Sequence, residues 1–111
     1  MNQGRWITAT VAITETVSGE VDLGEVFRKV LVLVPTLDNA TVTVHVAKES
    51  GGTFFPIYAL DDDATGDFPH ATTALTTAKA VIFECGAQHI KIVCGAAQNG
   101  GARTFYARGL N

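Results

Sequence analysis

The stretch "TVTVHVA", residues 41–47, shows the pattern that recurs through this sequence. Val42, Val44 and Val46 alternate with polar or small residues, and in an extended chain every second side chain points to the same side. Alternation of β-branched and polar residues is typical of a strand with one face in a core. The sequence therefore predicts a half-buried strand over residues 41–47.

The same period of two extends from this strand in both directions. Glycine, proline, asparagine and aspartate separate the apolar stretches, as expected of turns between strands, and strong helix patterns are absent from the sequence. The further predicted strands are residues 7–14, 21–23, 28–34, 54–60, 79–85, 89–94 and 103–110. Seven to eight short strands predict an all-β fold: a single antiparallel β-sandwich, jelly-roll-like, with an immunoglobulin-like arrangement as the alternative.

The length of 111 residues fits one domain. We expect a single β-sandwich domain over residues 1–111, with an N-terminal arm at 1–6 and a long loop at 61–78. The run 28–34 becomes apolar on both parities, which predicts a central strand covered on both faces, and Pro56 predicts an edge strand or a bulge. The expected core residues are Ile7, Val11, Ile13, Leu31, Leu33, Val42, Val44, Phe54, Val81, Phe83, Ile90, Ile92 and Phe105.

Composition narrows the classes of function. Hydrophobic residues make up 47% of the chain and charged residues 17%, with a net charge of −3, so the chain is expected to fold and to cover part of its surface with a partner. The cations are scattered and form no basic stripe, so nucleic-acid binding is not expected. No stretch approaches the ~18 apolar residues of a membrane span, and residues 1–6 lack a signal peptide's apolar core. We expect synthesis in a cytoplasm, with Cys85 and Cys94 as free thiols.

The stretch "YALDDDATGDF", residues 58–68, raises the question of a metal or catalytic site. Its acidic spacing matches the start of a calcium loop, but the glutamate expected at the twelfth position is replaced by Thr72. The spacing also resembles that of haloacid-dehalogenase-like phosphotransferases, whose chemistry needs a parallel α/β sheet that this sequence does not predict. We expect a solvated acidic turn with no catalytic residue, no bound metal and no cofactor, and keep a weak calcium site as the alternative. The residues of that alternative site are Asp61, Asp63, Thr65 and Asp67.

Four aromatic side chains are candidates for contact with a partner. Trp6 and Phe68 lie in segments that the sheets do not need, and alternation directs Phe55 and Tyr106 outward. Exposed aromatic rings serve equally well for stacking on a sugar and for packing against a partner subunit.

Three parts of the chain resemble small β-sandwich proteins from the structural gene cluster of tailed bacteriophages. They are "SGEVDLGE", "KVLVLVPTLDNATVTVHVAKESGGTFFPIYALDDDATG" and "HIKIVCGAAQNGGARTFYARG". In such proteins an apolar-Asp-Leu-Gly turn leads into a strand that ends at a proline. A Gly-Gly-Thr-Phe hairpin, an acidic turn, a His/Tyr-Ile-Lys-Ile strand and a last strand with arginine follow. The matching positions here are 22–24, Pro35, 51–54, 61–63, 89–92 and Arg103.

This resemblance implies a virion structural protein without enzymatic activity. The expected role is a capsid decoration or cement subunit that binds the shell of the major capsid protein and itself, as a homotrimer. The expected location is the virion, assembled in the host cytoplasm. The alternative is a carbohydrate- or receptor-binding β-sandwich module of a tail or fibre, which the outward aromatic residues would serve.

Overall fold

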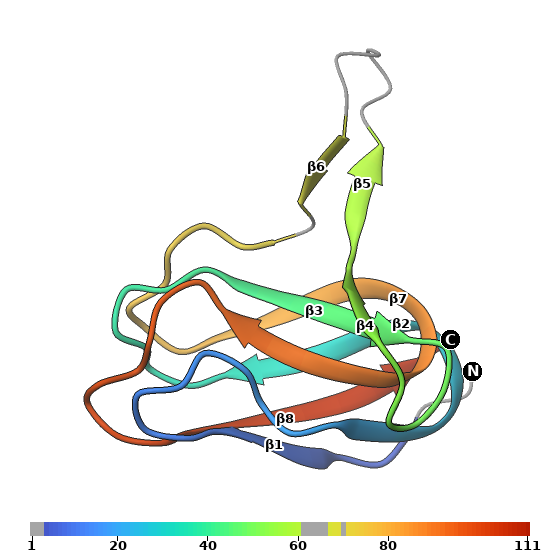
Figure 1. Cartoon of the computed structure of the whole chain (residues 1–111), viewed down its shortest axis with the longest axis horizontal. Coiled ribbons are helices and arrows are strands. Elements are labelled where there is room, and N and C mark those ends of the chain that lie inside the picture. The colour runs from blue at the N-terminus through green and yellow to red at the C-terminus, as the bar shows by residue number, and fades with distance from the viewer. Residues whose placement is uncertain (1–3, 61–66, 70) are drawn as a thin grey trace.

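The computed structural model describes residues 4–60, 67–69 and 71–111, and the prediction of an all-β fold is confirmed there. Six strands form one antiparallel sheet in the order β1-β8-β2-β7-β3-β4, and two short strands pair as a separate ribbon (Figure 1). Over these ranges no helix has the length and apolar character needed to cross a membrane. The strands are β1 (Ile7–Val11), β2 (Val21–Val34), β3 (Val42–Ala47), β4 (Phe54–Pro56), β5 (Tyr58–Leu60), β6 (Asp67–Pro69), β7 (Lys79–Cys94) and β8 (Arg103–Leu110).

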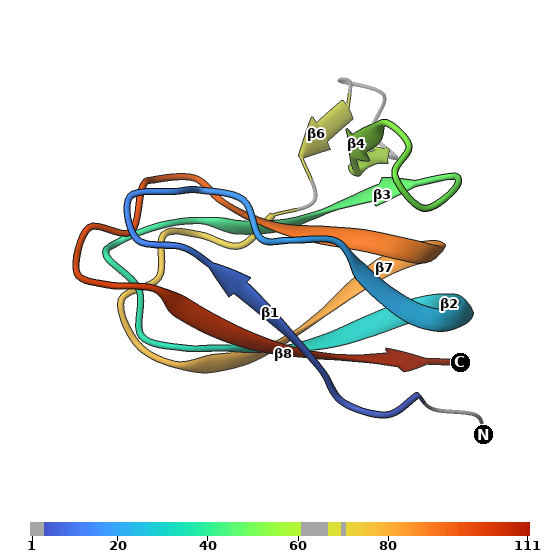
Figure 2. The ribbon, with the colours of Figure 1, turned by 60° about the horizontal axis from the view of Figure 1, so that its bottom comes forward.

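The two longest strands, β2 and β7, bend together and fold the sheet over on itself. They pair on both sides of the bend, and register shifts around Phe27 mark irregularities of the kind that bend a strand. Gly24 in β2 and Gly86 in β7 have φ angles of 92° and 59°, which glycine adopts at little cost. Figure 2 shows the result, with β3 in one half of the folded sheet and β8 in the other.

The expected jelly-roll-like sandwich is not confirmed, and neither is the immunoglobulin-like alternative. The main sheet has six strands because segments 21–23 and 28–34 belong to the single strand β2, and 79–85 and 89–94 to the single strand β7. Sequence reasoning separated them because the bends carry glycine and polar residues, which also mark turns.

Asp22 ties the two bends together. One of its carboxylate oxygens accepts hydrogen bonds from Gln88 Nε2 at 2.9 Å and from the Gly24 amide at 2.8 Å. These two bonds, the Gln88 bond first, hold the pKa of Asp22 below its usual value. The Asp-Leu-Gly segment therefore shapes a corner of the sheet.

The core lies between the two halves of the folded sheet and is largely the predicted one. In β2, however, Val30, Val32 and Val34 are buried, so the expected core residues Leu31 and Leu33 point the other way. The expected core residues found buried are Val11, Val42, Val44, Phe83, Ile90, Ile92 and Phe105, and Ile7 and Val81 pack against them partly buried.

Two other expected core residues are not in the core. Ile13 lies in the turn after β1 and is 54% exposed. Phe54 is only half-buried, and the Lys91 ammonium lies 4.7 Å from the centre of its ring. Both corrections have the same cause, since alternation weakens as a guide to burial beyond a strand's end and on a short edge strand.

A buried glutamine fastens the loop before β8. Gln98 is fully buried; its Oε1 accepts a 2.8 Å hydrogen bond from the Asp38 amide, and its Nε2 donates to the Ala96 carbonyl at 3.0 Å. The Asp38 carboxylate accepts hydrogen bonds from the Gly100 amide at 2.9 Å and from Arg103 Nη2 at 3.0 Å. The Gly100 bond, more than the Arg103 charge, lowers the pKa of Asp38.

The β5–β6 ribbon leaves the sheet at the outer edge of β3 and projects away from it (Figure 1). β4 pairs with residues 45–47 of β3 at this edge, in agreement with the edge position predicted from Pro56. The chain returns from the ribbon to pair with the rest of the edge, with Ala71 opposite Thr43 and Leu75 opposite Ala40. Leu75 is buried, so part of the stretch expected as a loop at 61–78 packs on the sheet.

Candidate functional site

An apolar face covers the outer side of the half-sheet formed by β8, β2 and the first part of β7. Leu33 pairs with Tyr106 on one side, and Leu31 pairs with Ile82 on the other. Ile82 is 55% exposed, Tyr106 44% and Leu33 38%. With Trp6 at its rim, 40% exposed, we define the apolar face as Trp6, Leu31, Leu33, Ile82 and Tyr106.

The period of two explains why these side chains face outward. Each of the four that lie in strands has an immediate neighbour in the core: Val32 beside Leu31 and Leu33, Phe83 beside Ile82, and Phe105 beside Tyr106. A strand that is apolar on both parities has a second side to cover, and within the described residues that side stays exposed here. Monomeric soluble proteins rarely expose large contiguous apolar patches, so this side has the character of a contact surface.

Trp6 is held at the rim of the face by Arg108. The guanidinium lies 4.8 Å from the centre of the Trp6 ring, and Arg108 Nε donates a 2.8 Å hydrogen bond to the Gly4 carbonyl. The Gly4 amide in turn donates to the Gly109 carbonyl at 2.9 Å. The segment before β1 is therefore fastened along the end of β8, with Trp6 beside the face.

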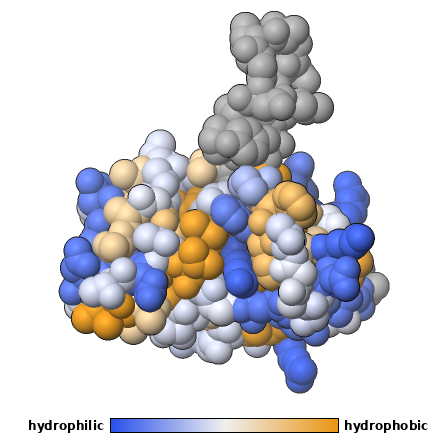
Figure 3. All heavy atoms as spheres, viewed as in Figure 1, coloured by the Kyte–Doolittle hydropathy of each residue, from blue (hydrophilic) through white to orange (hydrophobic). Residues whose placement is uncertain are grey.

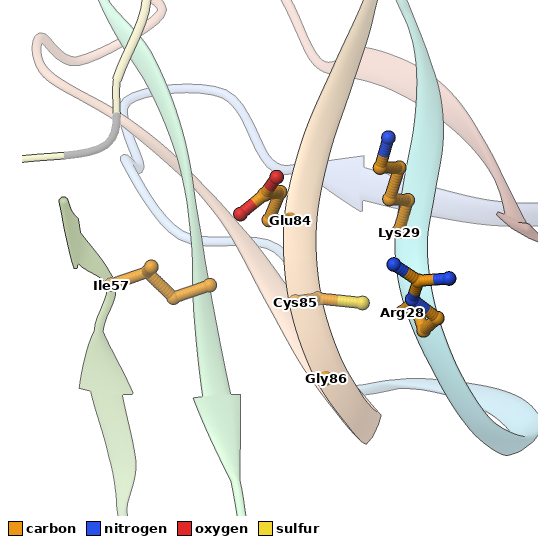
Figure 4. Close-up of a pocket in the computed structure, with 6 residues that line it drawn as sticks. All are labelled: Arg28, Lys29, Ile57, Glu84, Cys85 and Gly86. Carbon is orange, nitrogen blue, oxygen red and sulfur yellow. The ribbon is translucent and has the colours of Figure 1, made fainter. Parts of the chain in front are cut away.

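Cationic side chains border the face at the bend of β2. A shallow hollow of about 310 Å³ is lined by the apolar side chains of Ile82 and Leu110 and by the cations Arg28 and Lys29. Figure 4 shows a neighbouring hollow of about 410 Å³, in which Arg28 and Lys29 lie across from β7. Glu84 of β7 lies opposite Lys29 of β2 in the strand register. This end of the face can bind a segment that is apolar and acidic.

The second hollow also contains Cys85, whose thiol is a poor nucleophile. Its Sγ donates to the Phe27 carbonyl at 3.2 Å, and burial raises its pKa. Burial also raises the pKa of Cys94 to about 11. Both cysteines are free, as the sequence predicts, and their thiolates are disfavoured at neutral pH.

Phe55 lies far from the apolar face, on the edge strand β4. It is 59% exposed, and it borders a hollow of about 450 Å³ lined also by Lys48, Glu49, Gly52 and Thr53. An aromatic ring beside charged and hydroxyl groups is the chemistry of a sugar platform. Apolar residues also reach the surface on the side seen in Figure 3, in patches separated by hydrophilic residues.

The remaining predicted site residues fall largely outside the described structure. Asp61, Asp63 and Thr65 lie beyond the described residues, and Asp67 and Phe68 are placed only as part of strand β6. Among the residues that the structure does describe, no group of three or more His, Cys, Asp or Glu side chains could hold a metal ion.

Sequence reasoning found the aromatic members of the apolar face and missed the aliphatic ones. Trp6 and Tyr106 were candidates, whereas Leu31 and Leu33 were assigned to the core and Ile82 to neither class. The signal was present in the runs 28–34 and 81–83, which are apolar on both parities. One parity belongs to the core, and the other is then free for a contact surface.

Comparison with solved structures finds a similar fold in a prophage-derived protein. No family model matches the chain, and no curated protein matches it. The crystal structure of the SPBc2 prophage-derived protein YomS has a similar fold, with a TM-score of 0.57 and 13% identity, covering 100% of this chain and 96% of that one. The cyanophage Pam1 capsid asymmetric unit gives a TM-score of 0.32 at 16% identity, covering 97% of this chain and 86% of that one, which is too low to establish a shared fold.

Proposed function

We propose that this chain is a non-enzymatic structural subunit of a bacteriophage virion. Its proposed role is that of a capsid decoration or cement protein, which is bound on the shell of the major capsid protein and contacts copies of itself. The observation that carries the proposal is the apolar face, a rigid sheet surface whose large side chains are exposed in the single chain. In an assembled particle this surface is buried against protein.

The physics of the face suits a permanent contact. Trp6 and Tyr106 are of the residue types that dominate binding energy when they are buried in an interface. The side chains stand on paired strands over a packed core, so little ordering entropy is lost on binding. The positive charges of Arg28 and Lys29 contribute more to the orientation of the bound partner than to the affinity of the contact.

The fold and the sequence pattern support the same role. YomS, whose fold is similar, is described as prophage-derived. Within the described residues, the segments that resemble phage structural proteins form the bend of β2, the β3–β4 hairpin, the second part of β7 and most of the last strand. Those segments build the scaffold that presents the apolar face.

A direct test is the protein composition of particles purified by density gradient from cells that make this chain. The proposal predicts the chain in the particle fraction, at a fixed ratio to the major capsid protein by quantitative mass spectrometry. Absence of the chain from particles, with the chain present in the lysate, would contradict it.

A second candidate function is a carbohydrate- or receptor-binding module of a tail or fibre. The exposed Phe55 and its hollow beside Lys48 and Glu49 favour it. Affinity electrophoresis in gels that contain polysaccharides tests it, with Phe55→Ala as the variant and Tyr106→Ala as the matched control. Retardation that Phe55→Ala abolishes would establish this function, and equal mobility in every gel would exclude it for the sugars used.

A further inference from the structure

We propose that β1 of one copy of this chain pairs antiparallel with β1 of a second copy, edge to edge, about a two-fold axis. The contact comprises Ile7–Val11 of both copies. The inference deepens the proposed function, on which it rests only in expecting copies of the chain to contact one another. It names the surface through which they do so.

β1 is an open edge of the main sheet. It pairs with β8 on one side, and no described strand lies on its other side. In Figure 1 it forms the lower border of the molecule, away from the β5–β6 ribbon. An edge strand of this kind leaves a row of backbone N–H and C=O groups that can pair with another strand.

β1 lacks the features that protect the other edges of the described sheet. Its sequence, ITATV, has no charged residue, no proline and no glycine, and its register with β8 is continuous. By contrast, β4 is three residues long and ends at Pro56. The first part of β7, which pairs with β2 and with no other described strand, carries Lys79 and Glu84. Charges, proline and short length are the usual means of keeping edges apart, so β1 is the edge suited to pairing.

The sequence of β1 is complementary to itself. An antiparallel pairing centred on Ala9 places Ile7 opposite Val11 and Thr8 opposite Thr10, so each residue of the strand has a partner. Ala9 and Val11 are buried, whereas Thr8 and Thr10 are exposed. Every pair joins two residues of the same side, so the core sides of the two copies coincide and so do their outer sides. Thr–Thr pairs across antiparallel strands are stabilising.

β1 is held in place at both ends within its own chain. On the N-terminal side, the Gly4 amide donates a hydrogen bond to the Gly109 carbonyl at 2.9 Å. On the C-terminal side, the Thr14 amide donates to the carbonyl of the buried Gln98 at 3.0 Å. A strand that is already ordered loses little entropy when a second strand binds, which favours association.

The pairing joins the apolar faces of the two copies. Thr8 lies opposite Tyr106, and Tyr106 lies opposite Leu33, so the outer side of β1 continues into the apolar face. A two-fold axis perpendicular to the sheet at Ala9 keeps both faces on the same side of the joined sheet. Stable interfaces bury about 800 Å² on each partner, so a doubled face suits a permanent contact with a shell better than a single one.

The test places charges at the two outer positions of β1. The lysine variant is Thr8→Lys with Thr10→Lys, the glutamate variant is Thr8→Glu with Thr10→Glu, and the opposite-charge variant is Thr8→Lys with Thr10→Glu. Both positions are exposed, so no charge enters the core. The solution mass of each protein is measured by light scattering at low salt, up to about 1 mM, a concentration that populates even a weak contact.

The wild type is expected to form dimers and nothing larger. The lysine and glutamate variants should each dimerise at least tenfold more weakly, because position 8 of one copy then faces a like charge at position 10 of the other. The opposite-charge variant should dimerise at least as well as the wild type, because a lysine faces a glutamate in both pairs. A monomeric wild type, a larger oligomer, or an opposite-charge variant as weak as the lysine variant overturns the inference.

Mixing guards against loss of folding in the variants. An equimolar mixture of the lysine and glutamate variants should form a one-to-one dimer, detected by native mass spectrometry, because opposite charges now face each other. A mixture that stays monomeric overturns the inference. Amide hydrogen exchange locates the contact: with rising concentration of the wild type it should slow at alternate residues of Ile7–Val11. A dimer whose exchange slows elsewhere and not in β1 also overturns it.

The outcomes separate this inference from the proposed function. A wild type that enters particles at a fixed ratio but is monomeric in solution keeps the virion role and overturns the pairing of β1. A wild type that dimerises through β1 but is absent from particles keeps the pairing and removes the virion role.

Discussion

The Arg108 guanidinium lies 4.8 Å from the centre of the Trp6 ring, while its Nε donates a hydrogen bond to the carbonyl of Gly4. One side chain of β8 thus binds both the ring and the backbone of the segment before β1. Trp6 is the single tryptophan of the chain, so its fluorescence reports on the rim of the apolar face alone.

Replacing Arg108 by glutamine is expected to loosen this rim. The change removes a cation–π contact at a partly exposed site, so the free energy of unfolding should fall by about 0.5–1 kcal/mol. Trp6 emission should shift to longer wavelength because the ring becomes more exposed. Arg28→Gln is the control, because the cation that contacts the Trp6 ring is Arg108 and not Arg28. Unchanged emission in Arg108→Gln would contradict the assignment.

Gly109 is expected to be intolerant of a side chain. A Cβ at this position would overlap the ring of Phe27, which is buried at the bend of β2. Gly109→Ala should therefore lower the free energy of unfolding by about 1–3 kcal/mol through overpacking. Gly19→Ala, where a Cβ meets no atom within 4 Å, should change it little. Equal stability of the two variants in urea titrations would refute this packing.

Gln98 is expected to contribute to stability through its buried hydrogen bonds. Gln98→Ala leaves the Asp38 amide without its side-chain acceptor and creates a void, so a loss of about 1–3 kcal/mol is expected. Gln88→Ala removes an exposed hydrogen bond to Asp22 and should cost less than about 1 kcal/mol. Denaturant titration measures both losses, and the order of the two variants is the decisive result.

Stability is expected to fall in acid through carboxylates held by backbone and side-chain donors. The pKa values of Glu20, Asp22 and Asp38 are all below their ordinary values, chiefly because these carboxylates accept hydrogen bonds from the Gly51 amide, Gln88 and the Gly100 amide respectively. Groups whose pKa is lower in the folded state stabilise it above their unfolded pKa, about 4, and lose that contribution as the pH falls through the folded value.

Asp38→Asn tests this pH dependence at one site. The melting temperature of the variant should lie below that of the wild type near pH 7, and the two curves should converge as the pH falls to about 3. Thermal unfolding followed by circular dichroism over this range gives both curves. Curves that stay parallel at every pH would show that the Asp38 carboxylate has no such role.

The strand pattern could be predicted from the sequence because it is local. Alternation of side chains placed the strands at 41–47 and 103–110, and Pro56 marked the edge strand. The bends at Gly24 and Gly86 could not be told from turns, because a bend differs from a turn only in whether the pairing with the neighbouring strand continues. That pairing is a property of distant segments.

The candidate site was predictable in part for the same reason. Alternation directed Phe55 and Tyr106 outward, and both are exposed in the structure. It could not decide between Val32 and Leu33, since a run that is apolar on both parities carries no information on which side meets the core. The fold decides it, since Val32 is fully buried in the core and Leu33 is 38% exposed.

Competition for places in the particle tests the central claim most directly. Cells that make particles are given equal amounts of wild-type chain and of Ile82→Lys, and the ratio of the two in purified particles is measured by mass spectrometry. Burial of the apolar face predicts at least a tenfold excess of the wild type, because a buried lysine without a partner costs more than 1.4 kcal/mol, the energy of a factor of about ten. Ile13→Lys should compete equally. Equal incorporation of Ile82→Lys would contradict the account.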